Sequence, residues 1–216
     1  GIPGDSNLPL LNAIRKNENI DFILIRHEET AAFMASAHGK ITGNLGVCMS
    51  IAGPGATNLI TGLMDAATDR SPVLALVGQI PEVYLGSEAF QEISQIALFR
   101  PFAEYAETVA RANQAMKLTM MAAKYALKKP GLSVLSCPTD VLADKLDDSI
   151  IDPRKRIFSS ESVSADQEIQ KAADLINTCN KPVIFGGWGS RFSGDLLMEL
   201  SRKLKAPIAT TSRAKG

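Results

Sequence analysis

The chain has 216 residues with 23 Lys and Arg and 23 Asp and Glu, so its formal net charge is zero. It carries no basic block or acidic tail, so it lacks the electrostatic feature typical of nucleic-acid or membrane-surface binding. Its composition, 45% apolar, 21% charged and 6% aromatic, excludes the disordered, collagen-like and disulfide-rich classes.

Short apolar runs alternate with longer segments of helical period, which predicts an α/β fold: a parallel sheet with helices on both faces. The first domain is expected over residues 1–144. It should contain strands at 22–26, 46–51, 73–77 and 132–137, and helices at 8–16, 30–41, 56–66 and 113–128.

A polar, irregular stretch at residues 145–163 is interpreted as a linker. The pattern then resumes over 164–216, with a capped helix at 164–178, a strand at 182–187, a helix at 194–204 and a strand at 207–211. Two strands and two helices cannot cover both faces of their sheet. We therefore expect the start of a larger Rossmann-like domain, and chain ends that are cuts.

The three cysteines, Cys48, Cys137 and Cys179, are too few and too scattered for a disulfide framework or a zinc site. Cys48 and Cys137 fall inside expected strands, so we interpret them as small core residues. This usage favours a reducing, cytoplasmic location, and we expect no metal ligands in the chain.

A charged run, Arg26-His27-Glu28, lies between the first expected strand and a helix. Ligands of open α/β sheets bind at this end of a strand. Glu28 could serve there as a hydrogen-bond partner or proton carrier. Alternatively, it could interact only with the positive end of the helix dipole. His27 has no metal-ligand partner at helical spacing, and we interpret it as a packed side chain.

Further candidate segments follow strands or precede helices. Glycine allows a ligand to approach the backbone closely, although a purely structural turn explains Gly53-Pro54-Gly55 equally simply. Phe90 and Gln91 could line a pocket, or Phe90 could anchor a long loop. The remaining candidates are Gly1-Ile2-Pro3-Gly4, Asn58, Gly187-Trp188-Gly189 and Thr211-Ser212.

Taken together and in this order, the motifs resemble the thiamin-diphosphate-dependent enzymes of the pyruvate oxidase and acetolactate synthase group. The matching parts are Gly1-Ile2-Pro3-Gly4, Arg26-His27-Glu28, Ala52-Gly53-Pro54-Gly55, Pro72-Val73-Leu74-Ala75 with Gly78-Gln79, Ala89-Phe90-Gln91-Glu92 and Ala214-Lys215-Gly216. The resemblance implies that residues 1–144 bind the aminopyrimidine ring. It also implies that residues 164–216 begin a middle domain of the FAD-binding type.

The resemblance also implies roles for individual residues. The carboxyl group of Glu28 would hydrogen-bond the pyrimidine ring nitrogen, and Phe90 and Gln91 would face the active site of a partner subunit. The other implied cofactor contacts are Ile2, Pro3, Gly4, Gly53, Pro54, Gly55 and Asn58 for thiamin diphosphate, and Gly187, Trp188, Gly189, Thr211 and Ser212 for FAD.

The implied reaction is oxidative decarboxylation of pyruvate, as in pyruvate oxidase or pyruvate:quinone dehydrogenase. The alternative is carboligation of two 2-oxo acids, as in acetolactate synthase, and a different class would be a non-catalytic stand-alone subunit. The sequence lacks the family's Gly-Asp-Gly motif with a downstream Asn, so a domain outside this chain is expected to hold Mg and the diphosphate. A homo-oligomer, at least a dimer and expected as a tetramer, would place the active site at its interface.

Overall fold

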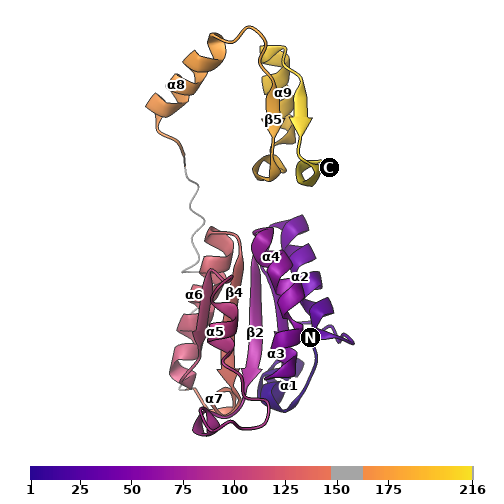
Figure 1. The fold of residues 1–216 in the computed structure, drawn as a ribbon, viewed down its shortest axis with the longest axis vertical. Helices are drawn as coiled ribbons and strands as arrows, with labels where there is room; N and C mark the ends of the chain where they lie inside the picture. Colours follow the sequence, from indigo (N-terminus) through magenta and orange to yellow (C-terminus); the bar gives the residue numbers. More distant parts are fainter. Residues whose placement is uncertain (147–162, 216) are drawn as a thin grey trace. The chain divides into compact units, whose positions relative to one another are not determined.

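The computed structural model describes residues 1–146 and 163–215, which fall into two compact units, Gly1–Ser160 and Glu161–Gly216 (Figure 1). Nearly all of the linker predicted at 145–163 lies outside the described residues. No helix in the described part of the chain is long and apolar enough to cross a membrane.

The first unit alternates helices and strands along the chain. Its elements are η1 (Asp5–Asn7), α1 (Leu8–Arg15), α2 (Glu28–Thr42), β1 (Gly46–Ser50), α3 (Pro54–Asn58), α4 (Ile60–Thr68), β2 (Val73–Gln79), η2 (Glu82–Tyr84), α5 (Gln95–Phe99), β3 (Tyr105–Thr108), α6 (Ala112–Lys128), β4 (Leu132–Pro138) and α7 (Thr139–Ala143). The single helix expected at 56–66 is instead two helices, α3 and α4, separated only at Leu59.

The four strands form one parallel sheet in the order β1-β2-β4-β3. This confirms the predicted α/β class and three of the four predicted strands. β3 was missed because it is a short edge strand with only one buried residue, Ala106, and therefore lacks a continuous apolar run.

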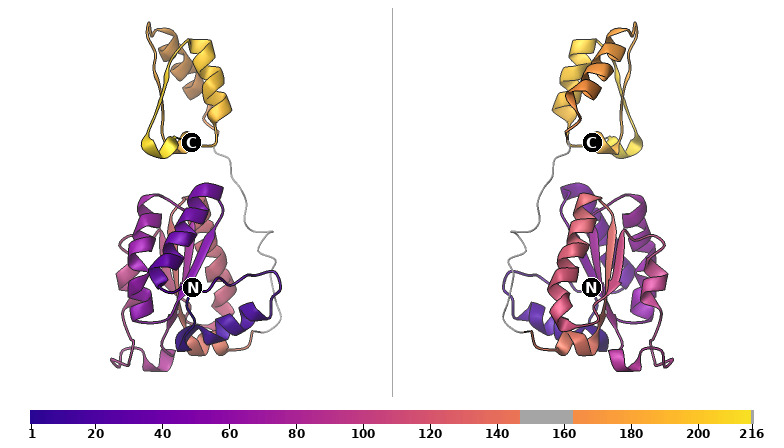
Figure 2. Two further views of the ribbon diagram at one scale, coloured as in Figure 1. Left: turned by 90° about the vertical axis from the view of Figure 1, so that its right-hand side faces the viewer. Right: turned by 90° about the vertical axis from the view of Figure 1, so that its left-hand side faces the viewer.

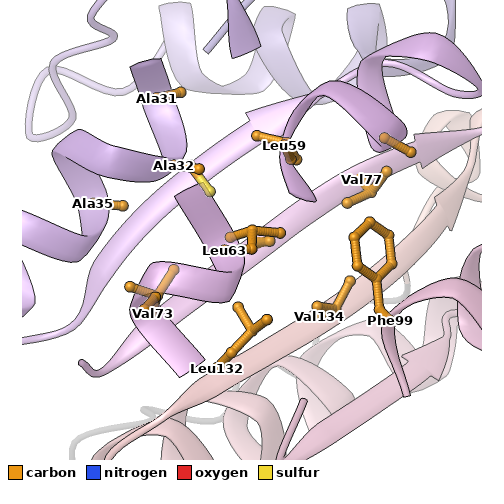
Figure 3. Close-up of a cluster of buried hydrophobic side chains, with 14 of the residues drawn as sticks. Ala31, Ala32, Ala35, Leu59, Leu63, Val73, Val77, Phe99, Leu132 and Val134 are labelled. Atoms are coloured by element: carbon orange, nitrogen blue, oxygen red, sulfur yellow. The ribbon is translucent and has the colours of Figure 1, made fainter. Parts of the chain in front are cut away.

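Side chains on successive strand residues point to opposite faces of a sheet. Val73, Val77, Leu132 and Val134 therefore face one layer, where they pack with Phe99, Leu59, Leu63 and alanines of α2 (Figure 3). Leu74 and Leu135 face the other layer and pack with Ala122 of α6. Figure 2 shows the strands enclosed between these helical layers.

The strand expected at residues 22–26 is not formed, and this prediction was wrong. Its backbone has one short pairing: the Gly1 amino group donates to the Ile23 carbonyl at 2.9 Å, and the Ile25 amide donates to the Gly1 carbonyl at 3.2 Å. A strand requires a ladder over several residues. The apolar composition of this segment predicted a strand. The sequence pattern does not indicate, however, whether another strand lies beside it to form the hydrogen bonds of a sheet.

The second unit contains α8 (Asp166–Asn177), β5 (Ile184–Gly186), η4 (Trp188–Ser190), α9 (Gly194–Leu204), β6 (Ile208–Thr210) and η5 (Ser212–Ala214). β5 and β6 pair in parallel. These elements match the predicted order of helix, strand, helix and strand. The expected side-chain cap at Ser164 is absent, because α8 starts at Asp166 after Ala165, which cannot provide one.

Candidate functional site

The N-terminal loop of the first unit lies across the carboxyl ends of the central strands. The Ala52 amide donates to Ser6 Oγ at 2.8 Å, just after β1. Thr139 Oγ1 lies 3.2 Å from the Ser6 carbonyl and 2.9 Å from the Gln79 carbonyl, so this hydroxyl joins the ends of β2 and β4 to the loop. The loop is therefore fixed at the sheet edge where ligands of such folds bind.

Glu28 is the first residue of α2, and its side chain points into the protein rather than into water. Its exposed fraction is 8%, and Asn58 Nδ2 donates to its Oε2 at 3.1 Å. The positive end of the α2 dipole favours a carboxylate at this position. The structure therefore brings two predicted site residues together, with Glu28 Oε2 bonded to Asn58 and Glu28 Oε1 beside Gly55.

His27 caps α2 and is not a packed side chain, contrary to its interpretation from sequence. The Glu29 amide donates to His27 Nδ1 at 3.3 Å, and the imidazole is more than half exposed. A helix N-terminus has amide groups without intrahelical partners, and a cap residue satisfies one of them. His27 therefore fixes where α2 begins and, with it, the position of Glu28.

The loop after β1 places two glycines where a side chain would not fit. A Cβ on Gly55 would lie 2.6 Å from Ile51 Cγ1 and 3.4 Å from Glu28 Oε1. Gly53 has φ +57°, and a Cβ there would lie 2.8 Å from the Gln91 carbonyl oxygen. The absence of a side chain at Gly55 therefore lets Ile51 pack closely against this loop beside Glu28.

The opening loop also reaches this neighbourhood, through Ile51. A Cβ on Gly4 would lie 2.5 Å from Ile51 Cγ2, on the same side chain that contacts Gly55. Asn7 fixes the loop, because its Oδ1 accepts from the Gly4 amide at 3.0 Å and its Nδ2 donates to the Ile2 carbonyl at 3.0 Å. Pro3 between them is exposed.

Phe90 does not anchor its loop, because its side chain is 88% exposed. Gln91 is half-buried and has φ +67°, with its backbone against Gly53. The segment that carries them is held by Glu92, whose carboxylate accepts from the amides of Gly86 at 2.5 Å and Ala89 at 3.1 Å. Backbone hydrogen bonds, that of Gly86 foremost, lower the pKa of Glu92.

Two cavities open beside this edge, but Glu28 lines neither of them. One, of about 240 Å³, lies between the ends of the strands and the segment that precedes α5, and its walls include Gln79, Glu92 and Ser136. The other, of about 440 Å³, lies beyond β3 near Arg111 and Asp140. Within the described residues no group of three or more His, Cys, Asp or Glu side chains could hold a metal ion.

The candidates in the second unit meet at the carboxyl ends of its two strands. η4, with Trp188, contacts η5, with Ser212, and the Thr211 amide donates to the Gly186 carbonyl at 3.0 Å. Among the described residues, no atom beyond the adjoining chain lies within 4 Å of the position that a Cβ would take on Gly187 or Gly189. This leaves an open backbone surface at the position where α/β units bind dinucleotides.

Sequence reasoning missed residues that hold the site without belonging to a motif loop. In the first unit they are Ser6, Asn7 and Glu92, and in the second unit Arg191, whose guanidinium carbon lies 4.3 Å from the centre of the Trp188 ring. Nothing in the sequence around Ser6, Asn7 or Arg191 indicates that these side chains hold the site. Glu92 is the exception, because it belongs to the Ala89-Phe90-Gln91-Glu92 motif.

Comparison with known proteins shows what the chain is similar to. Residues 1–98 match the family model described as "Thiamine pyrophosphate enzyme, N-terminal TPP binding domain". The matched residues all lie in the first unit. Among curated relatives of the chain, the protein described as "Putative thiamine pyrophosphate-containing protein YdaP" from Bacillus subtilis is 37% identical over 217 residues, and the acetolactate synthase of Arthrospira platensis is 34% identical over 225. The pyruvate oxidase of Lactiplantibacillus plantarum is 32% identical over 225 residues.

Each of these matches covers the whole chain, but the chain spans only 38%, 39% and 36% of the respective relatives. The similarity to thiamin-diphosphate-dependent enzymes therefore extends through the second unit, beyond the part that the family model matches. It confirms the resemblance drawn from the motifs.

The residues present fit the pyrimidine end of thiamin diphosphate. A buried carboxylate with one oxygen on Asn58 and a side-chain-free backbone beside its other oxygen suits a ring nitrogen that needs a hydrogen-bond partner.

Proposed function

We propose that the protein to which this chain belongs is a thiamin-diphosphate- and FAD-dependent enzyme that decarboxylates pyruvate oxidatively. The observation that carries the proposal is the buried Glu28 carboxylate at the start of α2, between Asn58 and Gly55. The similarity to a pyruvate oxidase and to acetolactate synthases supports the cofactor class.

In this proposal, Glu28 Oε1 holds a proton against the pyrimidine ring nitrogen, while Asn58 keeps the second oxygen, Oε2, in place. Bound thiamin diphosphate supplies the carbon nucleophile and electron sink that decarboxylation of a 2-oxo acid requires. The loops of Gly4 and Gly53 enclose the ring, and Phe90 and Gln91 face the active site of a neighbouring subunit. A domain outside this chain holds Mg and the diphosphate.

FAD is proposed for the second unit, at the surface formed by Gly187, Trp188, Gly189, Thr211 and Ser212. Two observations support this position: the five residues follow β5 and β6, and η4 contacts η5. The open backbone at Gly187 and Gly189 could approach a phosphate or ribityl chain closely. In an oxidase, FAD would supply the two-electron acceptor that oxidative decarboxylation of a 2-oxo acid requires in addition to the loss of CO2.

Acetolactate synthase activity is the second candidate, and the similarity to several acetolactate synthases favours it. Both candidates need the same Glu28, so the residues of the first unit do not distinguish them. They differ in product, because the synthase joins two 2-oxo acids whereas the oxidase passes electrons to an acceptor.

We also propose a homo-oligomer in the cytoplasm, at least a dimer and, as expected from sequence, a tetramer. Its support is the exposed apolar surface that α2 and α4 contribute through Phe33, Met34, Ile41 and Met64. Phe33 is the sixth residue of α2, and Glu28 is the first. A second copy covering this surface would complete an active site at the interface.

The test is release of CO2 from carboxyl-labelled pyruvate by the full-length protein with thiamin diphosphate, Mg and FAD. We expect release, with flavin reduction if the protein is an oxidase and acetolactate if it is a synthase. Glu28→Gln should lower the rate by about 10²- to 10⁴-fold, the usual range for a proton-transfer group. Glu29→Gln, on the partly exposed neighbour, is the matched control, and absence of CO2 release would contradict the proposal.

A further inference from the structure

The segment that carries Phe90 and Gln91, residues 85–92, folds back on itself and is called the return loop below. Gly86, Glu88 and Gln91 have positive φ angles of 87°, 59° and 67°. Residues other than glycine adopt such angles at a cost, and they persist where surrounding contacts determine them. Two non-glycine residues within four positions therefore call for a contact that holds the loop.

Glu92 provides this contact from the end of the loop. Its Oε1 accepts from the Gly86 amide at 2.5 Å, and its Oε2 accepts from the Ala89 amide at 3.1 Å. The Glu92 amide in turn donates to the Ala89 carbonyl at 2.9 Å. Hydrogen bonds from neutral amides to a carboxylate are about twice as strong as those between neutral groups.

The far side of the return loop meets the loop after β1. Gly53 has no side chain, and the position its Cβ would take lies 2.8 Å from the Gln91 carbonyl oxygen and 2.9 Å from Gln91 Cβ. The Gln91 backbone thus contacts the same loop that passes Glu28 at Gly55. A shift of the return loop would move Gln91 against Gly53.

We infer that Glu92 is a positioning residue that holds Gln91 and Phe90 in register with the Gly53–Gly55 loop. This inference rests on the proposed function, in which Gln91 and Phe90 face the reacting groups. Glu92 itself acts only through the return loop, because both carboxylate oxygens bind backbone amides. The hydrogen bonds that lower the pKa of Glu92 keep it ionised at neutral pH, and only the ionised carboxylate has two full acceptors.

The inference predicts a graded loss in three variants of the full-length protein. Glu92→Gln keeps one acceptor oxygen and presents an NH₂ group to the second amide, so it should retain part of the function. Glu92→Ala removes both acceptors. Glu88→Gln is the matched control, since it removes an exposed carboxylate from the same loop without removing an amide contact described above.

The first readout is amide hydrogen exchange of peptides from residues 80–95, which does not require activity. Protection at Gly86 and Ala89 should fall by about tenfold in Glu92→Ala, the factor that corresponds to one lost hydrogen bond of about 1.4 kcal/mol. Glu92→Gln should be intermediate and Glu88→Gln unchanged. Unchanged exchange in Glu92→Ala would overturn the inference.

The second readout separates positioning from general destabilisation. In Glu92→Ala, kcat for CO2 release should fall at least as much as kcat/KM, with unchanged thermal midpoint and cofactor binding, and Glu92→Gln should restore part of kcat. Faster exchange with unchanged kcat would show that Glu92 holds the return loop without affecting the reaction. That result would overturn the inference. Absence of activity in the parent protein would instead refute the proposed function.

Discussion

At the scale of single residues, burial decides which side chains can react. Cys48 and Cys137 lie inside β1 and β4, and desolvation raises the pKa of each thiol to about 12. Cys179 is exposed. The thiolate is the reactive form, so a group with so high a pKa remains protonated and inert at neutral pH.

We therefore predict that, of these three cysteines, only Cys179 reacts with a thiol reagent in the native protein. Mass spectrometry of labelled peptides checks this, with denatured protein as the control in which all three cysteines react. Labelling should not reach Cys48 or Cys137 even when the pH is raised to about 9, which remains far below their pKa. Rapid native labelling of Cys48 would contradict the burial described here.

The site at residue scale was partly predictable. Gly53, Gly55 and Asn58 were found because strand, turn and helix follow one another there, and that order is visible in sequence, whereas Glu28 was found beside an expected strand that the structure does not form. The spatial contacts were not visible: Asn58 and Glu28 are 30 residues apart, and the bond between them depends on the packing of α3 against α2. Glu92 was present in a motif, but its role is a backbone contact that no residue pattern specifies.

At the scale of elements, the side of α4 that faces the core should be sensitive to the loss of side-chain volume. Leu63 is fully buried among residues of α2, β2 and β4, whereas the next residue, Met64, is exposed. Deleting buried methyl groups removes transfer free energy and leaves a cavity, at a cost of about 2–5 kcal/mol.

We predict that Leu63→Ala lowers the free energy of unfolding of the first unit by about 2–5 kcal/mol. Thr61→Ala, at an exposed position of the same helix outside the apolar surface, is the control and should change it by no more than about 0.5 kcal/mol. Thermal and denaturant unfolding of the full-length protein, followed by circular dichroism, measures both. Equal effects of the two substitutions would show that α4 does not pack as described.

Strand prediction succeeded where burial is two-sided and failed where it is not. Every residue of β4 is buried, so its apolar run stands out in the sequence. The edge strand β3, Tyr105–Thr108, has no continuous apolar run and was missed, whereas residues 22–25 are apolar but, among the described residues, pair through their backbone with Gly1 and not with a neighbouring strand. The composition of a strand can be read from its sequence, but whether another strand lies beside it depends on the tertiary fold.

At the scale of the whole molecule, the exposed apolar surface of α2 and α4 bears on assembly. Ile41 is 75% exposed on this surface, although a large apolar side chain gains free energy from burial. In the proposed homo-oligomer, a second copy covers it. The zero net charge of the chain offers no long-range repulsion to oppose such self-association.

We predict that Ile41→Lys shifts the full-length protein towards smaller species in sedimentation velocity, with its circular dichroism spectrum unchanged. A lysine ammonium group at a buried interface loses its hydration without a partner. The control is Val83→Lys, which replaces an exposed aliphatic side chain on η2, outside this surface. An unchanged sedimentation coefficient in Ile41→Lys would argue against this surface as the interface.

The pairing of α2 with α4 has a consequence for how the site can move. Lys40 Nζ lies 2.6 Å from Asp65 Oδ2 and 2.7 Å from Asp69 Oδ2, and Ser36 Oγ donates to Asp65 at 2.7 Å. These bonds hold the carboxyl-terminal half of α2 to α4. At the amino-terminal end of α2, Asn58 of α3 bonds to Glu28. α2 is thus held by α4 in its carboxyl-terminal half and by α3 at its first residue, so a displacement of α3 and α4 together would carry α2 with them. Glu28 and Asn58 would then move together. A conformational change could therefore reorient the Glu28 carboxylate while its hydrogen bond to Asn58 stays intact.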